Sequence, residues 1–235
     1  MAALEKNMLG VVVPSQWESA FFGRKIGTLQ FSHSPSWLPH QHYDLIQAKI
    51  ACQAKTQISL LQQQGFELVT GEVDFCFTFS TLPLPAHPFC YASTQDIPAL
   101  HKLFESAFPH SRFRPPYFSL AEQQHFYRHW ISQAVQGTFD DICLLEKVDD
   151  VICGAISVRL HAKTARIGLL AVSPNFQRHG VATRLLQAAK QWAKQQKADS
   201  LWVATQPENH AAIACYQTLG ASQQACYHWF YKRNI

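Results

Sequence analysis

Residues 177–182, Gln177-Arg178-His179-Gly180-Val181-Ala182, are the stretch of the chain that decides its fold. They follow an apolar, strand-like run from Ile167 to Val172 and open a segment whose apolar residues recur at helical spacing. A glycine-containing turn between a strand and a helix leaves several backbone N–H groups without intrahelical partners, at the positive end of the helix dipole. Because Gly180 has no Cβ, a phosphate can approach the backbone closely there. The stretch therefore predicts a pyrophosphate-binding turn.

The residues after this turn predict a helix, a strand and a second, short helix. Apolar residues of the first helix lie at helical spacing: Val181, Leu185, Leu186, Ala189, Trp192 and Ala193. Residues 200–206 form a strand-like run, Asn209 is a suitable N-cap, and Gly220 suits the position after the last helical residue. Tyr216 follows Asn209 by two helical turns, so both side chains project from nearly the same face.

This order of loop, helix, strand, Asn and Tyr resembles that of the GCN5-related N-acetyltransferases. The match is carried by Gln177, Arg178, Gly180, Ala182, Asn209 and Tyr216. Ala182 stands where the family often has glycine, a change that the family commonly tolerates. The resemblance implies acetyl-CoA as the co-substrate and Tyr216 as the general acid that protonates the departing thiolate. The residues that it implies for acetyl-CoA binding are Leu170, Ala171, Val172, Gln177, Arg178, His179, Gly180, Val181, Ala182, Thr183 and Asn209.

The C-terminal part of the chain has the element order expected of that fold. Before the turn, the sequence predicts a strand at 89–92, helices at 94–108 and from Ser119 to about Gly137, and strands at 142–147, 151–160 and 165–172. Ser119-Leu-Ala-Glu122 reads as a capping box. A last strand is predicted at 226–232. We therefore expect an α/β (α+β) N-acetyltransferase fold, with a mixed central sheet flanked by helices.

Proline-rich residues 81–88 read as a linker between two domains. Residues 89–235 are then the acetyl-CoA-binding domain, and residues 1–80 a small N-terminal domain. Within the latter, a helix at 55–64, Gly65 and a strand at 72–79 repeat the helix, glycine and strand of the C-terminal end. This layout predicts a partial, truncated acetyltransferase-like domain in front of a complete one.

Several irregular segments resemble the dTDP-fucosamine acetyltransferase family from about residue 14 onward. They are residues 17–23, 71–74, 111–117, 136–140, 165–170 and 203–206. The resemblance implies a homodimer that acetylates the 4-amino group of dTDP-4-amino-4,6-dideoxy-D-galactose in enterobacterial common antigen synthesis. Transfer is then a direct attack by the amine within a ternary complex.

The acceptor would meet Arg112, Arg114 and Tyr117, which lie in the segment 111–117. Guanidinium groups suit the oxygens of a diphosphate, although solvated surface charges are the alternative for both arginines. Tyr117 or one of its neighbours Phe113 and Phe118 would stack on thymine or the sugar.

The acceptor amine must be neutral to attack, so a carboxylate or an ordered water has to take its proton. Glu72 is the slightly favoured carboxylate and Asp74 the other, while a charge facing solvent from an edge strand is an equal alternative. The oxyanion would accept a hydrogen bond from a backbone N–H near Leu170 or Val172.

Composition limits the remaining classes. With 47% apolar and 15% charged residues, the chain is globular, and its net charge of +4 includes no basic run that suggests nucleic-acid binding. The apolar runs are strand-sized, so we expect neither a signal peptide nor a membrane span. The seven cysteines are odd in number and lack CxxC spacing, so we expect no disulfide framework and a reducing cytoplasm. Cys215 is read as structural.

Three alternatives stay open at this point. One is an acetyltransferase for a protein N-terminus or a lysine, and another is a CoA-binding domain without turnover. The third is a metalloprotein, because His125 and His129 share a helix face and His40 lies near His42. No HExxH frame or cysteine pair supports it, so we expect no metal.

Overall fold

The computed structural model describes residues 10–31, 43–79 and 89–233, and these form two compact units. One unit comprises the described residues up to Glu72 together with those from Ala225 onward, and the other the described residues from Val73 to Gln224. The division therefore falls at other places than the predicted linker 81–88, which lies outside the described residues. The reason is that two long strands, β4 (Glu67–Thr78) and β10 (Ser222–Arg233), each contribute to both units.

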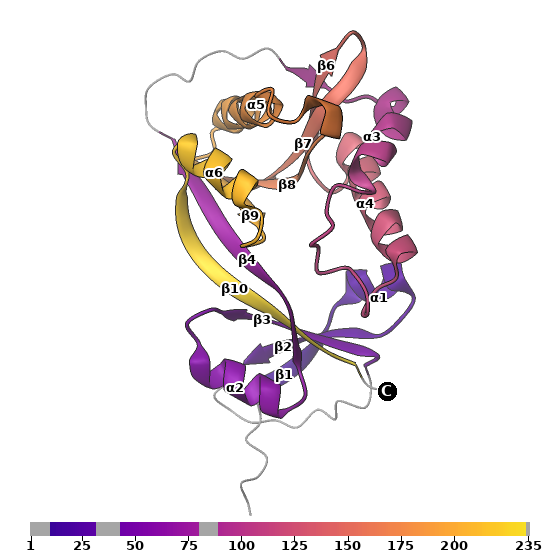
Figure 1. Cartoon of the computed structure of the whole chain (residues 1–235), viewed down its shortest axis with the longest axis vertical. Helices are drawn as coiled ribbons and strands as arrows, with labels where there is room; N and C mark the ends of the chain where they lie inside the picture. Colours follow the sequence, from indigo (N-terminus) through magenta and orange to yellow (C-terminus); the bar gives the residue numbers. More distant parts are fainter. Residues whose placement is uncertain (1–9, 32–42, 80–88, 234–235) are drawn as a thin grey trace, which may run out of the picture. The chain divides into compact units, whose positions relative to one another are not determined.

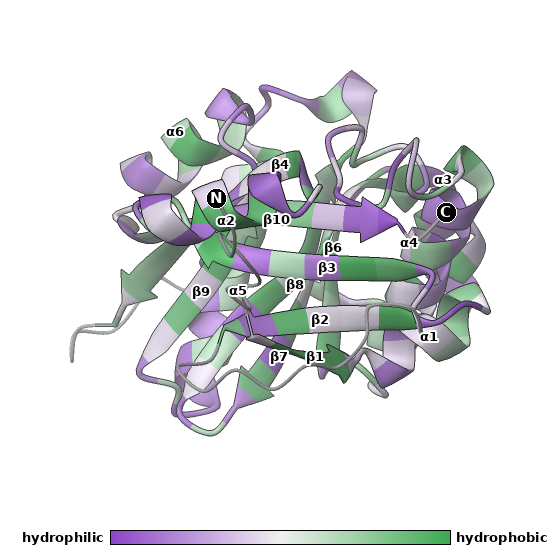
Figure 2. Cartoon of the chain, turned by 90° about the horizontal axis from the view of Figure 1, so that it is seen from below, coloured by the Kyte–Doolittle hydropathy of each residue, from purple (hydrophilic) through white to green (hydrophobic). Residues whose placement is uncertain are grey.

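The first unit is a small α/β unit. Its remaining elements are β1 (Gly10–Pro14), α1 (Gln16–Phe22), β2 (Ile26–Phe31), β3 (Leu45–Ala51) and α2 (Lys55–Gln63). Strands β1 and β2 pair antiparallel, β2 and β3 parallel, and β3 and β10 antiparallel. Figure 2 shows β10, β3 and β2 side by side, with hydrophobic stretches along β3 and β2. Phe66, Leu61 and Phe230 belong to the apolar core of this unit.

A disulfide joins Cys52, directly after β3, to Cys226 in β10. The expectation of no disulfide framework is therefore wrong for this pair, whereas Cys76, Cys90, Cys143, Cys153 and Cys215 are free. The two cysteines lie 174 residues apart in the sequence, so their spacing carried no signal. The pairing of β3 with β10 brings them together, and Cys52 N donates a hydrogen bond of 2.9 Å to Cys226 O.

The second unit has the predicted mixed sheet flanked by helices. Apart from β4 and β10, its strands and helices are β5 (Cys90–Tyr91), α3 (Ile97–Phe104), α4 (Leu120–Val135), β6 (Ile142–Val148), β7 (Val151–His161), β8 (Thr164–Val172), α5 (Val181–Gln195), β9 (Ser200–Thr205) and α6 (His210–Thr218). Within it the strands lie in the order β4-β9-β8-β7-β6-β5, and among these described strands only β8 and β9 pair in parallel.

Helix α5 packs on one face of this sheet, and α3 and α4 lie together on the other (Figure 1). The buried side of α5 carries the apolar residues that the sequence pattern predicts, including Leu185, Leu186 and Trp192. The predicted capping box of α4 is confirmed, since Ser119 N donates to Glu122 Oε2 (2.6 Å) and Glu122 N donates to Ser119 Oγ (3.2 Å).

Element ends differ from the sequence prediction where pairing overrides local pattern. Strand β4 begins at Glu67 rather than Glu72, and β10 at Ser222 rather than Cys226; each lies between two neighbouring strands in the sheet order. Helix α3 ends at Phe104 instead of Phe108.

Candidate active site

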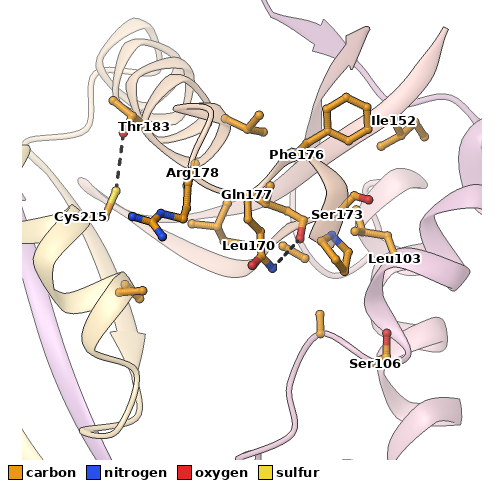
Figure 3. A pocket seen from close by; sticks show the side chains of 18 of the residues that line it. Leu103, Ser106, Ile152, Leu170, Ser173, Phe176, Gln177, Arg178, Thr183 and Cys215 are labelled. Atoms are coloured by element: carbon orange, nitrogen blue, oxygen red, sulfur yellow. Dashed lines mark hydrogen bonds between the residues drawn. The ribbon is translucent and has the colours of Figure 1, made fainter. Parts of the chain in front are cut away.

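A cavity of about 830 Å³ lies in the second unit. It is lined by the end of β8, the loop that follows, the first turn of α5, one side of α6, and α3 with the segment after it. Figure 3 shows Thr183, Cys215 and Arg178 towards one side of the cavity, and Ile152, Leu103 and Ser106 towards the other. Its volume lies within the range of small-molecule and cofactor sites.

Strands β8 and β9 separate at this cavity. Their parallel pairing is limited to the pairs from Thr164–Ser200 to Arg166–Trp202, whereas β8 continues to Val172. The edge of β8 that faces β9 therefore carries unpaired backbone groups beyond Arg166, and an extended ligand can bind to such an edge.

The direction of the backbone hydrogen bonds along β8 shows which groups lie at that edge. Ser173 N donates to Cys153 O (2.8 Å), so the backbone groups of Ser173 point towards β7. Those of Ala171, two residues earlier and opposite Ala155, point the same way. Since residues of a strand alternate between its two neighbours, the N–H and C=O groups of Leu170 and Val172 point away from β7, towards the cavity. Leu170, Ala171 and Val172 all line it, where the sequence placed the pantetheine-binding strand.

The turn before α5 has the geometry of an anion site. Gly180 caps α5 with φ of 77°, and Arg178 has φ of 64°, both in the left-handed region. Val181, Ala182 and Thr183 begin the helix and leave their N–H groups without intrahelical acceptors. No acidic residue lies in this first turn. The turn therefore favours a bound phosphate group through both hydrogen bonding and the helix dipole.

An ion pair between Arg184 and Glu146 holds this turn in place. Arg184 donates through Nε to Glu146 Oε1 of β6 (2.9 Å) and through Nη1 to His179 O (2.9 Å). A Cβ on Gly180 would lie 2.8 Å from Arg184 Nη1 and would displace the end of that side chain, and the positive φ of Gly180 favours glycine in its own right. Sequence reasoning missed Glu146 and Arg184, because nothing in their spacing shows that they meet.

Gln177 and His179 differ in position. Gln177 lines the cavity, and its Nε2 donates to Val172 O at 3.5 Å. The His179 ring nitrogen Nδ1 lies 2.8 Å from Gln177 O, and His179 is not among the lining residues described. Its contact is therefore within the loop.

Helix α6 brings Asn209 and Tyr216 to the cavity, as the shared helix face predicted. Asn209 is the N-cap, and its Oδ1 accepts from Ala212 N (3.2 Å). The ring of Tyr216 is 4% exposed and meets Phe75 and Phe77 edge-on, at centroid distances of 5.7 and 6.4 Å. Packing therefore fixes the ring.

The phenol of Tyr216 is well suited to carry a proton. Burial, with a smaller effect from the neighbouring Cys215, raises its pKa above the ordinary value near 10. Among the described residues, none forms a hydrogen bond with its hydroxyl. The group is therefore protonated at neutral pH and free to donate into the cavity.

Cys215 lines the same wall, with Sγ 3.8 Å from Thr183 Oγ1. Within the described part of the chain no basic side chain is paired with this thiol. This environment agrees with the structural role expected from the sequence.

The predicted acceptor residues lie on the segment before α4 and not on the cavity wall. Arg112 and Arg114 are half-buried, and the Arg112 guanidinium lies 4.0 Å from the centroid of the Phe113 ring. Phe113, Tyr117 and Phe118 are all buried, and Phe113 packs on Phe126 of α4 at 4.2 Å between centroids. The packing of Phe113 on α4 accounts for the burial of that ring, and stacking of Tyr117 or its neighbours on thymine or the sugar stays a prediction.

The two candidate bases are also engaged elsewhere. Glu72 belongs to the first unit, where it accepts from Lys49 Nζ (2.5 Å) and Trp229 Nε1 (2.8 Å). Asp74 is buried and paired with Arg166 at 2.7 Å. Neither lines the cavity.

The α3 side of the cavity was missed by sequence reasoning. Lys102, Leu103 and Ser106 line it, with Ile152 of β7 next to them. Their pattern in the sequence is that of any amphipathic helix, and only the packing of α3 beside β8 brings them to the cavity.

Among the described residues, no group of three or more His, Cys, Asp or Glu residues has an arrangement that would hold a metal ion. His40 and His42 lie outside the described residues. No helix in the described part of the chain has the length and apolar character needed to cross a membrane.

Comparison with known proteins gives the family. Residues 97–221 match the acetyltransferase (GNAT) family. The chain is 38% identical over 226 residues to the dTDP-fucosamine acetyltransferase of Escherichia coli O6:H1. The aligned region covers 94% of this chain and 97% of that protein.

Solved structures show the same fold at low sequence identity. A GCN5-related N-acetyltransferase from Sphaerobacter thermophilus has a TM-score of 0.60 at 20% identity, over 80% of this chain and 59% of that one. The PaiA N-acetyltransferase of Thermoplasma acidophilum, in complex with coenzyme A, has a TM-score of 0.51 at 14% identity, over 64% of this chain and 100% of that one. From the family match and the near full-length relative, this chain belongs to the GNAT family of acetyltransferases.

Proposed function

We propose that this protein transfers the acetyl group of acetyl-CoA to the 4-amino group of dTDP-4-amino-4,6-dideoxy-D-galactose (dTDP-fucosamine). The observation that carries the proposal is the 38% identity to dTDP-fucosamine acetyltransferase, which extends over nearly all of both chains. The cavity supports it, because it joins an anion-binding turn, an open strand edge and a protonated phenol.

The residues present fit acetyl-CoA. The N–H groups of the α5 turn, with Arg178 beside them, suit the pyrophosphate. The backbone groups of Leu170 and Val172 suit the amides of the pantetheine arm, which would extend along β8 as an added strand. Asn209 would lie along the same arm from the α6 side. Acetyl-CoA supplies the activated acetyl group as a thioester.

Two groups of the chain act on the reacting centre in this proposal. The N–H of Leu170 points into the cavity and donates to the oxygen that becomes negative when the amine attacks. Tyr216 then gives its phenolic proton to the leaving thiolate. Its raised pKa keeps that proton in place until the thiolate forms.

The proton of the attacking amine needs a separate acceptor. Glu72 is the carboxylate that the sequence favoured, but its hydrogen bonds to Lys49 and Trp229 occupy it. We therefore favour an ordered water as the acceptor, with Glu72 as the alternative.

For the sugar nucleotide, we propose that Arg112 and Arg114 hold the diphosphate, since both are half-buried and their guanidinium groups suit it. Lys102 and Ser106 add a cation and a hydroxyl on the α3 side of the cavity. The homodimer and the role in enterobacterial common antigen synthesis are proposals that follow from the resemblance alone. The cytoplasmic location is a proposal that rested on the cysteine pattern as well, and the Cys52–Cys226 disulfide removes that part of its support.

The test is a screen of acceptors with acetyl-CoA, following the release of free thiol. dTDP-4-amino-4,6-dideoxy sugars of both configurations at C4, a peptide with a free N-terminus, and a lysine peptide are compared at equal concentration. We expect kcat/KM to be highest for the D-galactose configuration. Turnover of a peptide at an equal or higher kcat/KM would instead favour a protein acetyltransferase, and no turnover of any amine would favour a CoA-binding domain.

A further inference from the structure

A buried carboxylate, that of Asp140, lies outside the cavity and has no part in the acetyl transfer proposed for Leu170 and Tyr216. Asp140, which precedes β6, is 0% exposed. Its Oδ2 accepts from Trp130 Nε1 of α4 (2.9 Å) and from Ser157 Oγ of β7 (2.5 Å). Its Oδ1 has no hydrogen-bond partner among the described residues, and Arg159 Nε lies 4.0 Å away.

The space for this carboxylate is made by Gly168 of β8. A Cβ at Gly168 would overlap Asp140 Oδ2 and would lie 2.9 Å from Ser157 Oγ. The absence of a side chain at Gly168 therefore lets the Asp140 carboxylate and the Ser157 hydroxyl lie directly against the backbone of β8.

Ser157 connects the carboxylate to the backbone of β8. Its hydroxyl hydrogen points to Asp140, which leaves its oxygen to accept from Leu169 N (2.9 Å). The pairing of β7 with β8 shifts at this point, because Ile156 lies opposite Leu170 while Val158 lies opposite Ile167. Two residues of β8, Gly168 and Leu169, therefore face the single residue Ser157, which is a β-bulge.

The bulge decides which N–H groups reach the cavity. Val158 O accepts from Asp141 N on the β6 side, so the backbone groups of its partner Ile167 point away from β7. In a regular strand Leu169 and Ala171 would share that direction, and the N–H groups of Leu170 and Val172 would face β7. With the bulge, Leu170 and Val172 face the cavity instead.

We infer that Asp140 and Ser157 are positioning residues for acetyl transfer: they hold the β8 bulge, and the bulge aims the Leu170 N–H at the reacting carbonyl. The inference rests on the proposed role of Leu170 in that transfer. Neither residue touches the cavity, so both act through β8.

Asp140 works here as an acceptor of hydrogen bonds rather than as a charge. Burial raises its pKa, so the charged form is the costly one. An amide in its place still offers one oxygen to Trp130 and Ser157. Asp140→Asn is therefore the conservative variant that should retain the arrangement, and Ser157→Ala is the variant that removes the link to Leu169.

The experiment compares the parent with Ser157→Ala, Asp140→Asn and Ser200→Ala. Ser200 is a matched control, because it is a buried hydroxyl of the same unit that accepts from Trp202 Nε1 (3.1 Å) away from the cavity. For Ser157→Ala we expect kcat to fall roughly 10- to 100-fold, with KM for acetyl-CoA changed less than about threefold. Asp140→Asn and Ser200→Ala should keep kcat within about threefold.

Amide measurements by NMR provide a readout that does not depend on turnover. In the protein without substrates, hydrogen exchange at Leu169 should be at least about tenfold faster in Ser157→Ala than in the parent. Added acetyl-CoA should shift the Leu170 amide signal in the parent and much less in Ser157→Ala.

Three results would overturn the inference. They are a kcat of Ser157→Ala within about threefold of the parent, a loss no larger than that of Ser200→Ala at equal loss of stability, or a loss in Asp140→Asn as large as in Ser157→Ala. If the parent does not acetylate dTDP-fucosamine, the proposed acceptor is wrong. The amide signals of Leu169 and Leu170 then decide the positioning role on their own.

Discussion

Replacing Tyr216 by Phe removes one oxygen atom from the cavity and leaves the ring in its packing against Phe75 and Phe77. The hydroxyl has no hydrogen-bond partner among the described residues, so its loss leaves no partner unsatisfied. We therefore expect the free energy of unfolding to change by less than about 1 kcal/mol. For a chain of this size that corresponds to a Tm shift of no more than about 2–4 °C.

Catalysis should respond very differently. If Tyr216 is the general acid, kcat of Tyr216→Phe falls by roughly 10²–10⁴-fold, the usual contribution of a positioned acid or base. The dissociation constant of acetyl-CoA should change little, because the α5 turn and the β8 edge are untouched. Thiol release gives kcat, calorimetry gives the acetyl-CoA affinity, and thermal unfolding gives Tm.

Tyr127→Phe is the matched control. Tyr127 is also a buried tyrosine of the second unit, but its hydroxyl lies 2.6 Å from Ser111 Oγ and outside the cavity. Losing that hydrogen bond should cost about 1 kcal/mol of stability and leave kcat within about threefold. Tyr216→Phe should therefore lose turnover and keep its stability, whereas Tyr127→Phe should lose some stability and keep its turnover.

The pH profile adds a second check. An acid works only while protonated, and burial raises the pKa of Tyr216, so its ionisation should lower kcat only above the ordinary value near 10. A Tyr216→Phe enzyme with turnover within about threefold of the parent would remove Tyr216 from the mechanism.

Three other changes test the turn and the acceptor side. Gly180→Asp should abolish detectable acetyl-CoA binding in calorimetry, since it adds a negative charge at the anion site and a Cβ that meets Arg184; binding within a few-fold of the parent would contradict the turn's role. Glu146→Gln should weaken acetyl-CoA binding by roughly 3- to 10-fold by loosening Arg184 under the turn, and an unchanged affinity would remove that brace from the account. Arg112→Ala and Arg114→Ala should raise KM for the sugar nucleotide far more than KM for acetyl-CoA, and equal effects on both substrates would show that they are not acceptor contacts.

The sequence predicted the parts of the site that are local in the chain. The turn at Gly180, the helix face shared by Asn209 and Tyr216, and the capping box at Ser119 all depend on spacings of a few residues, and the structure has each of them. The mixed sheet followed from the order of strands and helices, since that order leaves few ways to pack them.

Contacts between distant segments were out of reach. The disulfide, the Arg184–Glu146 brace and the link from Asp140 through Ser157 to Leu169 join residues that no local pattern relates. The packing of Phe113 on helix α4 was out of reach for a related reason, because an aromatic residue near arginines has the same sequence pattern whether it stacks on a ligand or on a helix.

The most direct test of the account is the identity of the product. The protein is incubated with acetyl-CoA and dTDP-4-amino-4,6-dideoxy-D-galactose, and the sugar nucleotide is analysed by mass spectrometry and NMR. We predict a gain of one acetyl group per sugar nucleotide, located on the nitrogen at C4 and dependent on active protein. An unmodified sugar nucleotide, under conditions where the same protein preparation acetylates a peptide amine, would contradict the central claim.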